Sequence, residues 1–254
     1  MLAEPDGLRT LERLLAGFSG AGGPAEAYRF DPADVVLRAP ITHPQKLIGI
    51  GLNYRDHSEE VQLKLPKEPL LFGMYASAII GPGDAIEIPS MSRQVDYEAE
   101  LAVVIGARTR RVRVEEALDY VAGYTIVNDV SARDLQFQDK QWLRAKSFDT
   151  FAPMGPCLST VSALGAADNL DIELRLNGKT MQKSTTANMI FNAPALVSHI
   201  SHVMTLLPGD VIATGTPSGV GFVRKPPVFL QPGDLVEIEI EGIGILRNPV
   251  VDTR

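Results

Sequence analysis

The sequence predicts an α+β protein built mostly from strands, and three observations lead to this fold class. From about residue 35 onward, short runs rich in β-branched residues alternate with turn residues. Three of the turns share a Pro-Gly-Asp core, in GPGDAIEI from residue 81, LPGDVIAT from residue 207 and QPGDLVEI from residue 231. Proline fixes φ and glycine accepts a positive φ, so each pair predicts a type II turn before a strand. The 22 glycines and 18 prolines also favour turns and strands over long helices.

Helical patterns are fewer. We expect helices near residues 8–15, where leucines follow helical spacing, and in VEEALDYVAG from residue 114, SARDLQFQDKQW from residue 131 and NAPALVSHISHVMTLL from residue 192. In the last stretch, the spacing of one helix face predicts a buried stripe of Leu196, Ile200, Val203 and Leu207. The small-residue stretch SGAGGPAEA is interpreted as a linker between the first helix and the strand-rich body.

Composition and charge limit the kinds of binding partner and the cellular compartment that this sequence fits. The chain has 254 residues, 45% apolar and 22% charged, with a net charge of −7 and no basic stripe, which argues against a nucleic-acid partner. A single cysteine, Cys157, excludes an internal disulfide and is expected to be a small buried residue in a reducing compartment. The stretch MLAEPDGLRTLERLL lacks the apolar core of a signal peptide, and no apolar run is long enough to span a bilayer. These features predict a cytoplasmic protein.

The stretch VDYEAELAVVIG, from residue 95, carries two acids where a buried strand is expected. Glu98 and Glu100 share one strand face, and Ala102 and Val104 continue that face as apolar. A second Glu-x-Glu pattern, in DLVEIEIEGIG from residue 234, is different because its apolar residues alternate cleanly with the acids. That second pattern predicts an ordinary strand with one solvated face.

Two buried carboxylates need a partner, since an unpaired buried charge costs several kcal/mol or takes up a proton. A hard divalent cation would remove this cost, and so would ion pairs with Arg93 or Arg133. The two explanations are equally compatible with the pattern. A third acid, Asp129, follows the predicted strand Tyr124-Thr125-Ile126-Val127 in GYTIVNDVSARDLQ. Asp129 is a candidate helix N-cap, but a capping box between Ser131 and Asp134 would leave it free to point into a cleft.

Three further side chains lie close in sequence to this third acid. Arg133 and Gln136 are three residues apart, which places them on one helix face. Lys146 lies among aromatic and apolar neighbours in WLRAKSFDTFAPMGP. Taken alone, it is interpreted as a lysine whose stem packs while its ammonium group reaches water.

Several stretches together resemble the fumarylacetoacetate hydrolase family. They are KLIGIGLNYRDHSEE, VDYEAELAVVIG, GYTIVNDVSARDLQ, AKSFD, TANMIFN and LLPGDVIATGTPSGVG, in this order between about residues 46 and 252. The resemblance implies a mixed β-roll of the type found in the C-terminal domain of that family, a homodimer, and an active site at the mouth of the roll. It assigns residues 46–254 to the catalytic domain. Residues 1–45 form a small N-terminal segment in place of the large SH3-like domain of full-length fumarylacetoacetases.

The resemblance also implies a metal site and its ligands. Glu98, Glu100 and Asp129 would hold Mg²⁺, with Mn²⁺ or Ca²⁺ as alternatives, and would leave positions open for substrate and water. His57 and Glu60, in NYRDHSEEVQLKLPKEP, would otherwise be interpreted as part of a polar surface turn. In similar proteins this segment is a mobile lid whose His–Glu pair activates water.

Substrate-binding roles follow from the same resemblance. Lys146 and Gln136 would stabilise a developing oxyanion, and Arg133 would contact the substrate. In TGTPSGVG, from residue 214, Thr216 would hold a substrate carboxylate. This stretch lacks the Gly-Lys-Ser/Thr ending of a phosphate loop.

The sequence therefore favours a metal-dependent enzyme that acts on 2-oxo acids or 1,3-dicarbonyl compounds through an enolate. Hydrolytic C–C cleavage of an acylpyruvate is the leading hypothesis, because histidine suits the deprotonation of water near neutral pH. The alternatives are an oxaloacetate decarboxylase or tautomerase, or a 2-hydroxyhepta-2,4-diene-1,7-dioate isomerase. A hypothesis from another class is a catalytically silent dimer that binds metal and a 2-oxo acid. The presence of His57 and Glu60 beside a complete acid triad argues against that last hypothesis.

Overall fold

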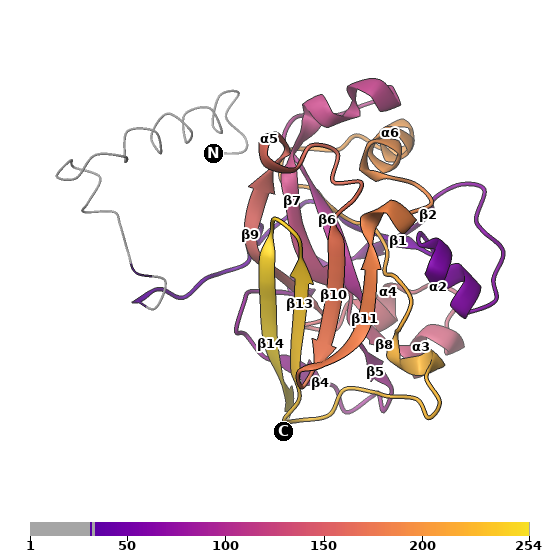
Figure 1. Ribbon diagram of the computed structural model, residues 1–254, viewed down its shortest axis with the longest axis vertical. Coiled ribbons are helices and arrows are strands. Elements are labelled where there is room, and N and C mark those ends of the chain that lie inside the picture. Colours follow the sequence, from indigo (N-terminus) through magenta and orange to yellow (C-terminus); the bar gives the residue numbers. More distant parts are fainter. Residues whose placement is uncertain (1–30, 32–33, 254) are drawn as a thin grey trace.

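The computed structural model describes residues 31 and 34–253, and its two larger β-sheets pack face to face (Figure 1). The helix expected near residues 8–15 and the linker that follows it lie outside the described residues. Helices cover the ends and flanks of the sheets rather than forming a layer of their own (Figure 1). The predicted class, α+β with strands dominant, is confirmed.

The larger sheet has seven strands and mixed pairing. In spatial order they are β2 (Leu70–Met74), β1 (Leu47–Gly51), β12 (Val211–Ala213), β6 (Ala99–Ile105), β7 (Val121–Asn128), β9 (Ala152–Thr160) and β3 (Ile79–Ile80). The pairs β1–β12 and β3–β9 are parallel, and the other pairs are antiparallel. Every residue of β6 and β7 is buried, so side chains at the ends of these central strands have well-defined positions.

The second sheet has five strands and packs on the first. In spatial order they are β11 (Lys179–Thr185), β10 (Asp171–Leu176), β13 (Leu235–Ile240), β14 (Gly244–Asp252) and β4 (Ile86–Ile88). Strand β10 contacts β6, β13 contacts β7, and β14 contacts β9. Strand β13 alternates as predicted, with Val236, Ile238 and Ile240 buried between the sheets. A short two-stranded ribbon joins β5 (Val95–Asp96) to β8 (Ser131–Ala132).

The three Pro-Gly-Asp turns form as predicted, and each precedes a strand. Gly83, Gly209 and Gly233 have φ of 81°, 85° and 96°, which L-residues with a side chain rarely adopt. In each turn the aspartate N–H donates to the carbonyl three residues earlier, at 3.3, 2.9 and 3.1 Å. The aspartate carboxylate in turn accepts a hydrogen bond from the first N–H of the turn, at 2.9, 2.7 and 2.8 Å. The repeated motif is therefore a turn closed by both the backbone and the aspartate side chain.

The middle turn also anchors β12 beside β1, so we expect Asp210→Ala to destabilise the fold. Asp210 is fully buried, and its carboxylate lies 2.7 Å from the Lys46 ammonium and accepts from the Lys46 N–H at 2.9 Å. Loss of one member of a buried pair costs about 3 kcal/mol of unfolding free energy. Urea unfolding measures this cost. Asp234→Ala, at the matching but more exposed position of the third turn, serves as the control and should cost about 1 kcal/mol. Equal losses in the two variants would contradict the anchoring role.

In the part of the chain that the structure describes, the helices are short and the longest is α6. The α-helices are α2 (Arg55–Glu60), α3 (Arg133–Gln138), α4 (Leu143–Lys146), α5 (Val161–Leu164) and α6 (Ala193–Val203). The 3₁₀ helices are η3 (Ala76–Ala78), η4 (Val114–Tyr120), η5 (Thr186–Asn188) and η6 (Gly221–Val223). Helix α6 packs against η4 at one end of the sheets.

Four details differ from the sequence-based expectations. The stretch from residue 114 forms only a 3₁₀ helix, because residues 121–123 pair in β7 instead. Helix α6 ends at Val203, which is 61% exposed, so the predicted buried stripe is wrong beyond Ile200. The stretch from residue 131 begins as a strand, its helix α3 ends at Gln138, and a second short helix, α4, begins only after the stretch, at Leu143. Cys157 is exposed rather than buried, and its Sγ contacts the Ile243 carbonyl at 3.4 Å.

Candidate active site

The pairing of β6 with β7 brings the three predicted acids together. Glu98 directly precedes β6, Glu100 is the second residue of β6, and Asp129 directly follows β7. Antiparallel register places Ala99 opposite Asn128, and the Asp129 N–H donates to the Glu98 carbonyl at 2.9 Å. The site is therefore fixed by backbone pairing between two fully buried strands and not by a flexible loop.

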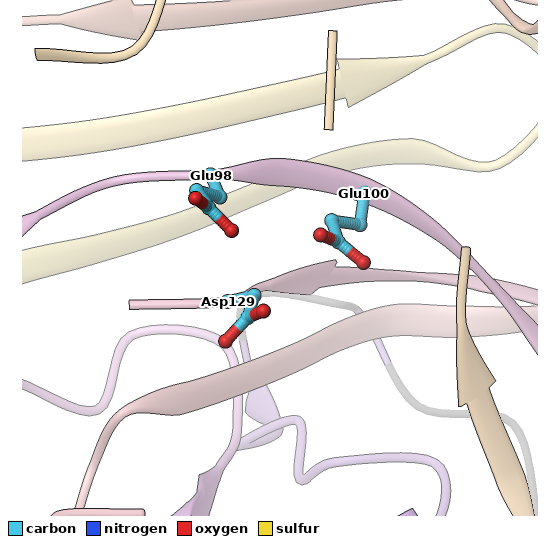
Figure 2. A group of neighbouring side chains, drawn as sticks. All are labelled: Glu98, Glu100 and Asp129. Carbon is cyan, nitrogen blue, oxygen red and sulfur yellow. The ribbon is translucent and has the colours of Figure 1, made fainter. Parts of the chain in front are cut away.

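The three carboxylates converge as Figure 2 shows, with Glu98 and Glu100 extending from one chain segment toward Asp129. Each residue offers an oxygen within 4.8 Å of the oxygens offered by the other two. Glu100 Oε2 accepts from the Gly215 N–H at 2.8 Å, whereas Asp129 Oδ1 is buried with no hydrogen-bond partner. An all-oxygen donor set with an unpartnered buried oxygen fits a hard divalent cation such as Mg²⁺.

Two basic side chains, those of Lys146 and Arg133, also contact the three carboxylates. Lys146 Nζ lies 2.7 Å from Glu98 Oε2 and 2.7 Å from Asp129 Oδ2, and Arg133 contacts Glu98 Oε1 at 2.7 Å. Of the two arginines considered from the sequence, Arg133 is thus the one that pairs with the acids. The interpretation of Lys146 as a lysine whose head reaches water is wrong, since the side chain is 2% exposed and both ends are buried.

The charges in this cluster do not cancel. Burial alone would raise the pKa of Glu98, but Lys146 and Arg133 outweigh it and lower that pKa to about 2. Burial, together with the negative charges of Asp129 and Glu98, raises the pKa of Glu100 well above its ordinary value. Burial also raises the pKa of Asp129 to about 7, although the Lys146 ammonium opposes the shift. The protein therefore supplies less positive charge than three ionised carboxylates require.

The path of the backbone, and not a capping box, directs the Asp129 side chain into the acid cluster. Helix α3 begins at Arg133 without a side-chain cap, so the predicted pairing of Ser131 with Asp134 is wrong. Ser131 Oγ donates to the Asp129 carbonyl at 3.0 Å, and Asp134 accepts from Ser92 Oγ at 2.7 Å. Asp129 still points toward Glu98 because β7 ends there.

Arg133 is held by a residue that the sequence interpretation missed. Its Nε donates to Asp96 at 2.9 Å, and its guanidinium also donates to Gln136 Oε1 at 2.8 Å, so the two residues share one helix face as predicted. Asp96 is fully buried and accepts from the Gly221 and Phe222 N–H groups at 2.8 and 3.1 Å. Asp96 lies two residues before Glu98, so the same alternation that singled out the two glutamates could have identified it.

His57 and Glu60 lie on α2 and meet at the cleft instead of forming a surface turn. His57 Nδ1 is 3.2 Å from Glu60 Oε2, and the other Glu60 oxygen accepts from the Gly219 N–H at 2.9 Å. Glu60 therefore connects α2 to the TGTPSGVG stretch. With Nδ1 engaged, Nε2 is the ring nitrogen left to exchange a proton with a ligand.

Thr216 is oriented by a second residue that the sequence interpretation missed, Gln182 on β11. The Gln182 amide donates to Thr216 Oγ1 and to the Pro217 carbonyl, both at 2.8 Å, and its carbonyl accepts from the Ala99 N–H at 2.9 Å. Since Thr216 Oγ1 accepts from Gln182, its own hydroxyl proton is available for a ligand oxygen. No local pattern marks Gln182, because its partners lie on distant segments.

A cleft of about 280 Å³ opens onto the cluster. It is lined by Ile50, Gly51, Leu52, His57, Val61, Leu63, Phe72, Glu98, Glu100, Arg133, Gln136, Phe137, Trp142, Lys146, Thr216 and Phe222. Of the nine predicted site residues, seven thus line one cavity, while Glu60 contacts His57 and Asp129 is fully buried beside Glu98.

Among the described residues, no helix is both long and apolar enough to cross a lipid bilayer.

Comparison with known proteins finds one matching family and similar named relatives. Residues 46–251 match the family described as Fumarylacetoacetate (FAA) hydrolase C-terminal. A Xenopus laevis protein named oxaloacetate tautomerase fahd2, mitochondrial, is 51% identical over 221 residues, which cover 86% of this chain and 69% of that protein.

Two solved structures are similar throughout most of the chain. The 2-hydroxyhepta-2,4-diene-1,7-dioate isomerase from Mycobacterium marinum has a TM-score of 0.78 and 44% identity, covering 88% of this chain and 81% of that one. The fumarylacetoacetate hydrolase from Exiguobacterium antarcticum has a TM-score of 0.79 and 44% identity, covering 85% of this chain and 78% of that one.

Proposed function

This chain belongs to the fumarylacetoacetate hydrolase family, and from that premise we propose that it is a divalent-metal-dependent enzyme that interconverts the keto and enol forms of a 2-oxo acid. The observation that carries the proposal is the acid triad, in which Asp129 Oδ1 has no hydrogen-bond partner, at the base of a cleft that also contains His57 and Lys146. Relatives named as an oxaloacetate tautomerase and a dienedioate isomerase support proton transfer as the reaction class.

Glu98, Glu100 and Asp129 are the residues that would hold the cation. When bound there, a cation such as Mg²⁺ would act as a Lewis acid that stabilises negative charge on the 2-oxo group. This assignment requires only the oxygens that already converge in the cluster.

The chain's own residues supply the remaining chemistry. Keto–enol conversion moves a proton between carbon 3 and the oxygen on carbon 2, so it needs a proton acceptor and a proton donor. In the keto-to-enol direction His57 Nε2 accepts the proton from carbon 3, with Glu60 holding the imidazole, and the Lys146 ammonium donates a proton to the oxygen on carbon 2. Both transfers run in reverse in the enol-to-keto direction. Thr216 donates its hydroxyl proton to the substrate carboxylate, and Gln136 on α3 helps to orient the substrate.

A product analysis tests this proposal. The Mg²⁺-loaded protein is given the enol form of oxaloacetate, and the loss of enol absorbance is followed while products are identified. We expect accelerated conversion to the keto form without loss of carbon dioxide. Stoichiometric metal binding without acceleration of any 2-oxo acid reaction would instead indicate the catalytically silent alternative.

Hydrolytic C–C cleavage of an acylpyruvate, the leading hypothesis from the sequence, is the second candidate. It is favoured by one observation, the His57–Glu60 pair, which has the arrangement needed to deprotonate a water molecule. Release of pyruvate from an acylpyruvate would establish this reaction.

His57→Ala tests the role of the pair in either reaction. We expect the turnover number to fall by about 10²–10⁴, the usual contribution of a general base, while Mg²⁺ affinity measured by calorimetry stays the same. The matched control is Glu59→Ala, on the exposed side of the same helix, which should leave the turnover number unchanged. A fall in Mg²⁺ affinity that equals the fall in rate would contradict the assignment.

A further inference from the structure

Asp96 is fully buried behind one wall of the cleft. In the part of the chain that the structure describes, it does not line the cleft, yet it contacts two residues that do, Arg133 and Phe222. We propose that Asp96 is the positioning residue that holds the Arg133 guanidinium where it can donate to the substrate. This inference rests on the proposed function, because it concerns how the same site binds a 2-oxo acid.

The Asp96 carboxylate accepts two hydrogen bonds on each of its oxygens. Oδ1 accepts from the Tyr97 and Gly221 N–H groups at 2.9 and 2.8 Å. Oδ2 accepts from the Phe222 N–H at 3.1 Å and from Arg133 Nε at 2.9 Å. Three backbone N–H groups therefore fix the carboxylate, and the fixed carboxylate determines where the Arg133 Nε–H can point.

The contact with η6 needs a glycine at position 221. A Cβ atom there would lie 2.5 Å from Asp96 Oδ1 and 1.9 Å from the Val228 carbonyl, so any side chain would push the carboxylate away. The same contact places the Phe222 ring, whose centroid lies 4.6 Å from the Arg133 guanidinium. The guanidinium is thus held at one edge by Asp96 and over one ring face by Phe222.

Arg133 keeps a donor for a ligand while it is held in this way. A guanidinium carries five N–H protons. Nη1 donates to Gln136 Oε1 at 2.8 Å, whereas Nη2, although 2.7 Å from Glu98 Oε1, is buried and makes no hydrogen bond of good geometry. A buried donor without a hydrogen bond is costly, and an oxygen of a bound substrate would remove that cost. Nη2 is therefore the donor that Asp96 presents to the substrate.

The negative charge of Asp96 also balances the pull of the acid cluster on Arg133. Among the described residues, Asp96 and Glu98 are the two carboxylates in contact with this guanidinium. Without Asp96, attraction to Glu98 would act alone and would draw the guanidinium from Phe222 toward the acid cluster. Arg133 would then pair with a carboxylate that is expected to hold the metal, and it would no longer donate to the substrate.

Asp96→Asn tests the proposal, because the amide keeps the shape of the side chain but faces two donors with its NH₂ group. At saturating Mg²⁺, we expect the KM for enol oxaloacetate to rise about tenfold, the usual effect of losing a hydrogen bond to a charged group. The kcat should change far less, because His57 and Lys146 keep their contacts. Calorimetry with malate, which has both carboxylates of oxaloacetate but no keto–enol conversion, should show a similar loss of affinity.

Arg133→Lys asks whether Asp96 acts through Arg133. Lysine keeps the buried positive charge but lacks the planar guanidinium that Asp96 orients, so this variant alone should also raise KM about tenfold. In the Arg133→Lys background, Asp96→Asn should add no further rise in KM or loss of malate affinity. If Asp96→Asn does not fold, Arg133→Lys still decides the matter, since an unchanged KM in that variant would overturn the proposal.

Asp210→Asn is the matched control. Asp210 is also fully buried, accepts from the Leu207 and Lys46 N–H groups and pairs with the Lys46 ammonium, but it lies away from the cleft. Urea unfolding should show a loss of stability in both Asp96→Asn and Asp210→Asn. The control should leave KM and malate affinity unchanged, because its partners do not contact the substrate.

The outcomes separate this inference from the proposed function. An Asp96→Asn protein that is less stable but has an unchanged KM and malate affinity would show a structural role alone and overturn the proposal. So would a further tenfold effect in the Arg133→Lys background. The expected pattern of malate affinities without enol conversion by any form of the protein would support the role of Asp96 and overturn the proposed function.

Discussion

Replacing Glu100 with glutamine should abolish stoichiometric Mg²⁺ binding and lower kcat/KM by at least about a hundredfold, since a Lewis-acid cation contributes several kcal/mol. Glu100 makes no ion pair with Lys146 or Arg133, in contrast to Glu98, so its charge is the one most available to a bound cation. Glutamine keeps the shape of the side chain and a carbonyl oxygen for the Gly215 N–H, which makes this variant a test of charge. Calorimetry measures the metal, and enol absorbance measures the rate.

The chain contains its own control for this experiment. Glu237 belongs to the second Glu-x-Glu pattern, on β13, and its carboxylate contacts Arg175 and Arg247 on the surface of the sheet. Glu237→Gln should change neither Mg²⁺ binding nor the rate. If Glu100→Gln retains one Mg²⁺ per chain with the affinity of the unmodified protein, the ligand assignment is wrong.

Lys146→Met should separate the metal site from the proton donor. In the metal-free protein the change leaves Glu98, Glu100 and Asp129 with Arg133 alone as a contacting cation, and it should cost about 3–5 kcal/mol of unfolding free energy. Because a divalent cation replaces the lost positive charge, Mg²⁺ should raise the Tm of this variant more than that of the unmodified protein. The turnover number should nevertheless fall by about 10²–10⁴, since the donor is absent.

Thermal unfolding with and without Mg²⁺, calorimetry and enol absorbance together measure these effects. Lys140→Met, at an exposed position shortly before α4, is the control and should leave all three unchanged. Loss of Mg²⁺ binding in Lys146→Met would show that the lysine is needed to form the site and not to transfer a proton.

Much of the fold could be predicted because its signals are local. A proline next to a glycine defines a turn within four residues, and the alternation in β13 depends only on which face meets the other sheet. Predictions failed where tertiary pairing overrides local preference. Residues 121–123 continue a helical pattern, but they are taken into β7 by its partners β6 and β9. Val203 has helical spacing, yet α6 ends there and leaves it exposed.

The acid cluster could be predicted in part because its sequence signal is also local. Two carboxylates on a face that becomes apolar need a partner, and this requirement alone marks Glu98 and Glu100 as candidate site residues. The sequence pattern is equally compatible with a bound metal ion and with an ion pair to arginine. In the structure Arg133 pairs with Glu98, and Asp129 Oδ1 has no hydrogen-bond partner. The location of the Lys146 ammonium depends on the path of the chain through α4, which no local pattern encodes.

The central claim is that Glu98, Glu100 and Asp129 hold one divalent cation on which the enolisation of a 2-oxo acid depends. The most direct measurement removes metal from the purified protein with EDTA and records the initial rate of enol-to-keto conversion as Mg²⁺ is restored. We expect the metal-free protein to be inactive and the rate to reach a plateau when one Mg²⁺ per chain is bound. Equal rates in the metal-free and Mg²⁺-loaded protein would contradict the claim.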